Sequence, residues 1–177
     1  HLASAGRAAM DRGDFSAGRS LFRRATTILA EDDPKRLALT PDLAVVLLES
    51  EDLDEARTAL ARARKASDPV TAAIATVVEN SLDFYGGGSI PREARIARRE
   101  DARRVLEAAD HDEGLGYYWW DLAGEKWVSL RAAETAAACE RGLDHFRRAG
   151  LYRRTDDLVW WIRSAYVFGP TPVPDAI

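Results

Sequence analysis

The feature that most constrains the fold of this chain is a pattern that occurs twice between residues 13 and 63. The first copy is a short turn followed by apolar residues at helical spacing: Gly13-Asp14-Phe15, Phe22 and Ala25. The second copy has the same layout 38 positions later: Glu51-Asp52-Leu53, Ala56, Leu60 and Ala63. Each turn ends one helical stretch and opens another, so the pattern predicts helical hairpins in tandem.

The apolar periodicity and the signals for helix ends predict nine helices and no clear strand, which makes the expected fold class all-α. The expected ranges are Leu2–Arg12, Phe15–Leu29, Lys35 to about Glu49, Leu53–Ala66, Val70–Tyr85, Pro91–Ala109, Asp112 to a turn at Gly124–Trp127, Ser129–Ala149 and Tyr152–Val167. Asp68, before Pro69, is a plausible N-cap of the fifth helix. A single hairpin cannot bury its own apolar stripe, so we expect the hairpins to stack.

We expect one helical repeat domain over residues 1–177, with two interruptions. The run Gly86-Gly87-Gly88-Ser89 predicts a flexible link near residues 86–90. The proline-rich end predicts an extended tail over residues 169–177. Because the chain starts with His1 and its last residues are typical of the start of another helix, we expect a piece of a longer protein.

The composition argues against several classes of protein. The net charge of −4 lacks the basic footprint of a general nucleic-acid or anionic-membrane binder. No run of 18 apolar residues predicts a membrane span, and the N-terminus lacks the apolar core of a signal peptide. The single cysteine, Cys139, allows no internal disulfide, so the cytoplasm is the expected location.

The chain shows no convincing catalytic, cofactor or metal site. The glycine run lacks the Lys-Ser/Thr ending of a phosphate-binding loop, and His111 between two aspartates is better explained as a helix cap than as a metal ligand. Cys139 and His145 point in different directions on one helix, which disfavours a nucleophile–base pair. We therefore expect no cofactor.

Two further clusters each have two interpretations. The arginines from Arg92 to Arg104 alternate with Glu93, Glu100 and Asp101, which favours an ion-paired solvated face over a polyanion site. The aromatic run Tyr117–Trp120 and the pair Trp160-Trp161 favour packing between helices, with a partner surface as the alternative.

The two copies resemble tetratricopeptide repeats. The matching positions are Gly6, the Gly13 turn, Phe22 and Ala25 in the first copy, and Leu43-Ala44, Leu47, Ala56, Leu60 and Ala63 in the second. In the seventh and eighth helices, the resemblance assigns Gly124 and Trp127 to the turn. It implies a right-handed α-solenoid of about four to five degenerate hairpins.

The whole chain is similar to the repeat region of large bacterial regulators. These proteins join a class III adenylate/guanylate cyclase domain or a DNA-binding domain to a signal-transduction ATPase. The segments that carry the similarity are Leu29–Pro34 with Arg36-Leu37, Leu53–Ala56, Leu143–Gly150 and Phe168–Pro174. The resemblance implies a non-catalytic scaffold for protein–protein or interdomain contacts. The alternatives are a small-molecule-sensing domain that relays to an ATPase or cyclase and, third, a helical enzyme domain.

The repeat resemblance also implies a binding groove lined by the first helix of each hairpin. The implied residues are Arg7, Met10 and Asp11, then Val45, Leu48 and Glu49, then Tyr118 and Asp121. The expected partner is a protein, a peptide or a neighbouring domain of the same parent chain, with no specific nucleic acid and no membrane. A homodimer through exposed terminal helices is a further option.

Overall fold

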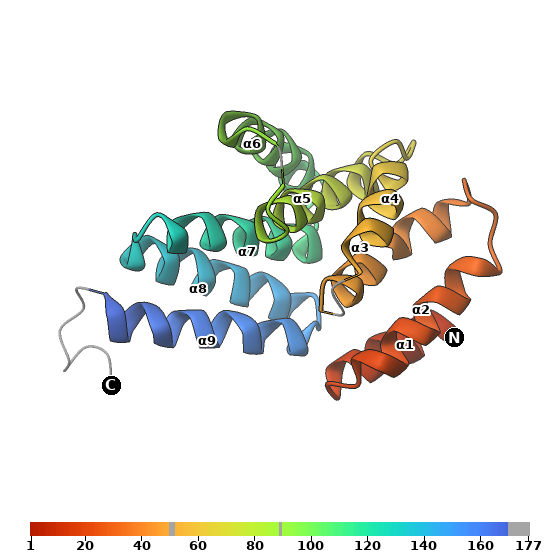
Figure 1. Ribbon diagram of the computed structural model, residues 1–177, viewed down its shortest axis with the longest axis horizontal. Coiled ribbons are helices and arrows are strands. Elements are labelled where there is room, and N and C mark those ends of the chain that lie inside the picture. The colour runs from red at the N-terminus through yellow and green to blue at the C-terminus, as the bar shows by residue number, and fades with distance from the viewer. Residues whose placement is uncertain (50–51, 89, 170–177) are drawn as a thin grey trace. The chain divides into compact units, whose positions relative to one another are not determined.

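The computed structural model describes residues 1–49, 52–88 and 90–169 (Figure 1). Within these ranges the chain has helices and no strand, which confirms the all-α prediction. The helices are α1 (Leu2–Asp11), α2 (Phe15–Thr27), α3 (Pro34–Glu49), α4 (Leu53–Ala63), α5 (Pro69–Tyr85), α6 (Arg92–Ala108), α7 (Asp112–Val128), α8 (Ala132–Arg148) and α9 (Tyr152–Phe168).

The chain forms two compact units, which we describe separately. Unit 1 is His1–Ala109 and contains α1 to α6, and unit 2 is Asp110–Ile177 and contains α7 to α9. The single repeat domain and the right-handed solenoid stay predictions. Of the expected tail, residues 170–177 lie outside the described residues, as does Ser89 of the expected link.

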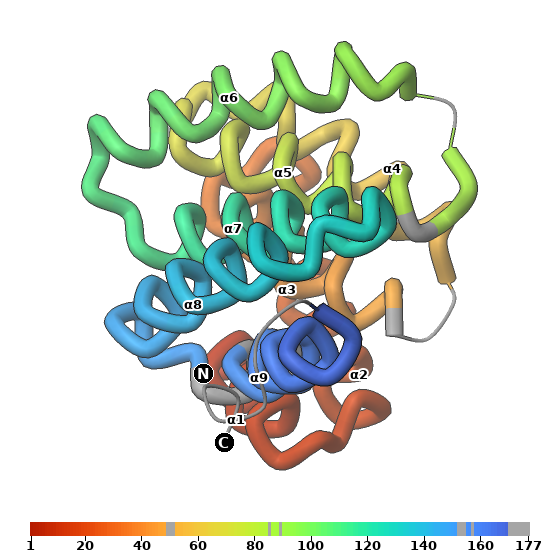
Figure 2. The backbone as a smooth tube through the Cα atoms, turned by 90° about the vertical axis from the view of Figure 1, so that its left-hand side faces the viewer, coloured from red at the N-terminus to blue at the C-terminus, as the bar shows by residue number. Residues whose placement is uncertain are grey.

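In unit 1, each helix packs against the next one along the chain, and α3 also packs against α5. Figure 2 shows α6 lying along α5. The core of this unit consists largely of small and branched apolar side chains from α3, α4 and α5, such as Ala44, Leu47, Leu60 and Val77. Burial of these side chains holds the helices together, since short helices are marginal in isolation.

In unit 2, α8 packs against both α7 and α9, and Figure 1 shows the three helices side by side. The largest buried side chains of this unit include Tyr117, Phe146 and Leu158. Gly150, just after α8, has φ +73°, a conformation that favours glycine and ends the helix.

Local capping explains where several helices begin. The Asp14 side chain accepts a hydrogen bond from the Ala17 amide at 2.9 Å and caps α2. The Asp68 side chain accepts from the Thr71 amide at 2.9 Å and caps α5, which confirms the predicted cap. His111 caps α7, because its Nδ1 accepts from the Gly114 amide at 3.1 Å.

The turn between α7 and α8 lies later than the sequence predicted. Gly124 and Trp127 are inside α7, which continues to Val128, and α8 begins at Ala132 rather than Ser129. The reversal uses Leu130, which has φ 57° and is 92% exposed. The helix continues because Trp127 reaches the rings of α9, so packing outweighs the helix-breaking tendency of glycine.

In both units, a glycine of one helix lies opposite a large side chain of the helix that packs against it. In α1 and α2, a Cβ added to Gly6 would lie 3.0 Å from the Phe22 ring, and one added to Gly18 would lie 2.8 Å from Met10 Sδ. These glycines let the two backbones approach and leave room for the large side chain opposite.

In α7 and α8, a Cβ on Gly116 would lie 2.5 Å from Phe146 Cε1, and one on Gly142 would lie 3.1 Å from Trp119 Cβ. The second helix of each pair has glycine, phenylalanine and alanine at the same intervals along the chain. These residues are Gly18, Phe22 and Ala25 in α2, and Gly142, Phe146 and Ala149 at the end of α8. The match is hard to recognise in the sequence because the two pairs differ in length: α7 and α8 have 17 residues each, against 10 in α1 and 13 in α2.

Candidate functional site

A groove opens in unit 1 between α2, α3 and α4. Its volume is about 510 Å³, which lies within the range of small-ligand sites. We call it the α2–α4 groove and define it by its lining residues: Arg23, Thr26, Thr27, Glu31, Arg36, Leu37, Thr40, Leu43, Asp54, Glu55, Thr58, Ala59 and Arg62. Thr27, Glu55, Thr58 and Arg62 are exposed at its rim, so the groove is open to solvent.

Helical periodicity places these side chains. On α2, Phe22 and Ala25 point into the core, which turns Arg23 and Thr27 toward α4. On α4, Ala56 and Leu60 are buried, which leaves Glu55 and the next turn facing the groove. On α3, Leu37, Thr40 and Leu43 contribute to the lining, and Leu43 is buried beneath it.

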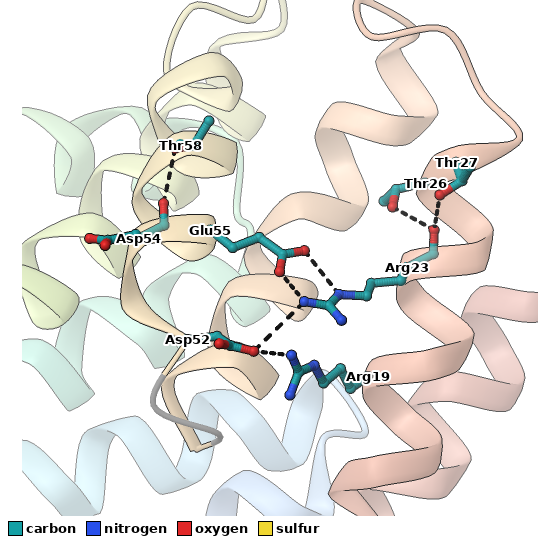
Figure 3. Close-up of polar contacts among 8 residues, drawn as sticks. All are labelled: Arg19, Arg23, Thr26, Thr27, Asp52, Asp54, Glu55 and Thr58. Carbon is teal, nitrogen blue, oxygen red and sulfur yellow. Dashed lines mark hydrogen bonds and ion pairs between the residues drawn. The ribbon is translucent and has the colours of Figure 1, made fainter.

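An ion-pair cluster lies at one end of the groove (Figure 3). Arg23 spans from α2 to α4, where its Nε donates to Glu55 Oε1 at 3.0 Å and its Nη2 also donates to Glu55 Oε2. Asp52 pairs with Arg19 and lies 3.7 Å from Arg23 Nη2. The hydrogen bond to Glu55 is the largest cause that raises the pKa of Arg23 above its ordinary value. The cluster therefore ties α2 to the start of α4.

A second ion pair lies near the opposite end of the lining. Arg62 Nη1, on α4, lies 3.0 Å from Glu31 Oε1, in the segment that follows α2. Both side chains are mostly exposed, so this pair contributes little to stability. In the groove, this pair engages Arg62 and Glu31 with each other rather than with a ligand.

Threonines on α2, α3 and α4 line the groove, and each hydroxyl donates to a carbonyl of its own helix. Thr26 and Thr27 donate to the Arg23 carbonyl at 2.9 and 2.7 Å. Thr40 donates to Arg36 O at 3.2 Å and Thr58 to Asp54 O at 2.9 Å. Since each hydroxyl has one proton, the oxygens of the exposed Thr27 and Thr58 are available to a ligand as hydrogen-bond acceptors, whereas Thr26 and Thr40 are buried.

Arg36 differs from the other lining arginines, Arg23 and Arg62, in that its partner is a neutral carbonyl rather than a carboxylate. Its Nη1 donates to the Leu29 carbonyl at 3.0 Å, and its side chain is half-buried. No carboxylate in the described parts of the chain lies within ion-pair distance of its guanidinium. Arg36 therefore presents free N–H groups to the cavity.

The residues implied by the repeat resemblance lie elsewhere. Arg7 pairs with Asp42 of α3 at 2.8 Å, Met10 is buried against Gly18, and Asp11 is exposed. None of these lines the α2–α4 groove.

The implied residues of the later hairpins are mostly buried. Val45 is 1% exposed, because α3 is covered by its neighbours on most of its surface, so Val45 lines no open surface. Leu48 is partly exposed, and the side chain of Glu49 lies outside the described residues. Tyr118 and Asp121 are buried on α7.

The aromatic cluster of unit 2 is mainly packing. Tyr117 lies edge-on to Phe146 with ring centroids 5.3 Å apart, and Arg141 lies over the Trp119 ring at 4.8 Å. The Trp127 and Trp161 rings have centroids 6.4 Å apart. Trp160, in contrast, is 61% exposed on α9.

The arginine-rich α6 has the ion-paired face that the sequence predicted. Arg103 lies 2.9 Å from both Glu100 and Glu107, and Arg104 pairs with Asp101. Arg99 departs from this pattern because it is buried. Arg98, which precedes it on α6, lies 3.4 Å from Glu79 of α5.

Comparisons with known proteins give no assignment. A scan against protein-family models finds no match, and a search of curated proteins finds no relative. Among the described residues, no three His, Cys, Asp or Glu side chains are arranged to hold a metal ion. Within the same residues, every helix is too short or too polar to cross a bilayer.

Proposed function

We propose that this chain is a non-catalytic interaction scaffold of tetratricopeptide-like hairpins within a larger bacterial regulatory protein in the cytoplasm. The observation that carries the proposal is the α2–α4 groove, whose walls come from three helices and whose rim is exposed. In two helix pairs a glycine packs against a phenylalanine, Gly6 against Phe22 and Gly116 against Phe146, and this shared contact supports the repeat part of the proposal.

The groove suits a protein segment as its ligand. It offers acceptor oxygens on α2 and α4 and a guanidinium on α3, which is the mixture of groups that a peptide backbone and a polar side chain can satisfy. Its two ion pairs link α4 to α2 and to the segment that follows α2, so a ligand would meet a surface that is already ordered.

The second candidate is a small-molecule sensor that relays to an ATPase or a nucleotide cyclase. The observation that favours it is the cavity volume of about 510 Å³, which would also hold a metabolite. Native mass spectrometry of the purified chain distinguishes the two functions. A bound mass below about 1 kDa, the size of a ligand that such a cavity encloses, supports the sensor.

The scaffold is tested by placing a photo-cross-linking amino acid at Thr58, on the groove rim, in cells that contain the parent protein. The matched control position is Arg104, which is 69% exposed and lies on α6, away from the groove. We expect discrete protein adducts, or cross-links to other domains of the same parent chain, from Thr58 and not from Arg104. Equal labelling at both positions, or no adduct from Thr58, would refute the scaffold.

A further inference from the structure

We propose that the α2–α4 groove binds an extended segment of a partner protein through one acidic side chain, whose carboxylate pairs with Arg36. This inference rests on the proposed scaffold function and specifies the chemistry of the partner. It names a residue that the repeat resemblance did not place in a binding site.

The partners of the three lining arginines identify Arg36 as the anchor. Arg23 is held by Glu55, with Nε to Oε1 at 3.0 Å, and Arg62 is held by Glu31 at 3.0 Å. Arg36 makes one hydrogen bond, to a neutral carbonyl. A guanidinium binds a carboxylate through two parallel N–H groups, so Arg36 can accept an external carboxylate without breaking an existing pair.

Charge and burial favour a negative group at this point. Arg36 is half-buried, and a cation that has lost part of its water gains more from a nearby carboxylate than an exposed one does. Two of the lining carboxylates are already paired, since Glu31 and Glu55 each hold an arginine. The carboxylate of Asp54 points away from Arg23 and α2 in Figure 3.

The threonine hydroxyls distinguish a peptide from a bare anion. While their protons remain on helix carbonyls, the oxygens of the exposed Thr27 and Thr58 can accept hydrogen bonds from a ligand, whereas Thr26 and Thr40 are buried. A bare carboxylate such as acetate has no donor for them. A peptide supplies backbone N–H groups on both sides of its acidic side chain, and it can satisfy both the arginine and the threonines.

The test uses the ¹⁵N-labelled chain and a capped peptide, Ala-Ala-Glu-Ala-Ala, followed by NMR. We expect saturable shifts of the Arg36 Nε–H resonance and of the Thr26 and Thr58 amides. The same peptide with Gln in place of Glu should bind about tenfold more weakly or worse, since a hydrogen bond to a charged group is stronger than a neutral one. Equal affinity for the two peptides overturns the proposal.

Two variants and one small anion complete the experiment. Arg36→Met should remove the response to the acidic peptide, whereas Arg24→Met, on the exposed face of α2 outside the groove, should leave it unchanged. Sodium acetate that shifts the same resonances as strongly as the peptide at equal concentration would indicate a simple anion site and would overturn the peptide partner. The Glu–Gln comparison uses the unaltered chain, so it stays decisive if Arg36→Met does not fold.

Failure here and failure of the scaffold are separable. If the acidic peptide gives no groove shifts while Thr58 still forms specific cross-links, the scaffold function stands and the Arg36 anchor is refuted. If neither occurs, both are refuted.

Discussion

Replacement of Gly116 by alanine should destabilise unit 2, although alanine is the better helix former. The added Cβ would lie 2.5 Å from Phe146 Cε1 and 2.9 Å from Cγ, so the ring or the helix must move. Phe146 is fully buried and lies edge-on to Tyr117, with ring centroids 5.3 Å apart, so the ring has little space to move into.

The magnitude follows from two opposing effects. Alanine gains about 1 kcal/mol over glycine in a helix interior. Overpacking of a filled core costs about 1–3 kcal/mol, and a contact this short falls in the upper part of that range. We therefore expect a net loss of about 1–2 kcal/mol in the free energy of unfolding of unit 2.

The assay is urea unfolding followed by tryptophan fluorescence. All 5 tryptophans of the chain lie in unit 2, so this signal reports on α7 to α9 and not on unit 1. With a urea dependence of about 1 kcal/mol per M for a unit of this size, the midpoint should fall by about 1–2 M. Gly6→Ala is the control, because its Cβ would meet the Phe22 ring at 3.0 Å in unit 1 and should leave the fluorescence midpoint unchanged.

A midpoint that is unchanged or higher in Gly116→Ala would refute the close packing of α7 on α8. The double variant with Phe146→Leu provides a further check, since a smaller side chain opposite the new methyl group should recover part of the loss. We expect a coupling of about 0.5–2 kcal/mol between the two positions, because they are in direct contact. Additive effects would mean that the two side chains do not meet.

Three further predictions concern single polar or reactive groups. Glu55→Gln weakens the pair with Arg23 and should lower the free energy of unfolding of unit 1 by less than about 1 kcal/mol, because both side chains are over 40% exposed. The measurement is a urea titration followed by circular dichroism. A loss larger than this would contradict the prediction. The hydrogen bond from Arg148 is the largest cause that lowers the pKa of Asp112 from its ordinary value of 3.8, so the ionised Asp112 stabilises the fold above pH 3.8 and this stabilisation is lost as the pH falls through the lowered pKa. Asp112→Asn should therefore have a smaller free energy of unfolding than the unaltered chain at pH 7, and the difference should shrink toward pH 2. A difference that does not depend on pH would count against the Arg148–Asp112 pair. Burial raises the pKa of Cys139 to about 12, so a thiol reagent at pH 8 should label it far more slowly in the native chain than in urea, and equal rates would show that it is accessible.

Sequence reasoning identified the helices well and the candidate site poorly. Caps such as Asp14 and Asp68 act on amides two to three residues away, so they can be recognised without the fold. Arg36 could not be recognised as an anchor, because its lack of a carboxylate partner depends on where Glu55 and Glu31 point across the groove. The four threonines carried no signal on their own, since a hydroxyl that bonds to its own helix is common at many surface positions.

The amino-acid sequence by itself determined the class of the fold, because the 3.6-residue period of apolar side chains and the capping residues are local properties. It also held the shared spacing of Gly18, Phe22 and Ala25 with Gly142, Phe146 and Ala149, which indicates how a helix pair packs. Only the tertiary structure decided that the reversal after α7 occurs at Leu130 and that α2, α3 and α4 enclose a groove. Both depend on contacts between residues far apart in the chain, where packing outweighs the local preference of any single residue.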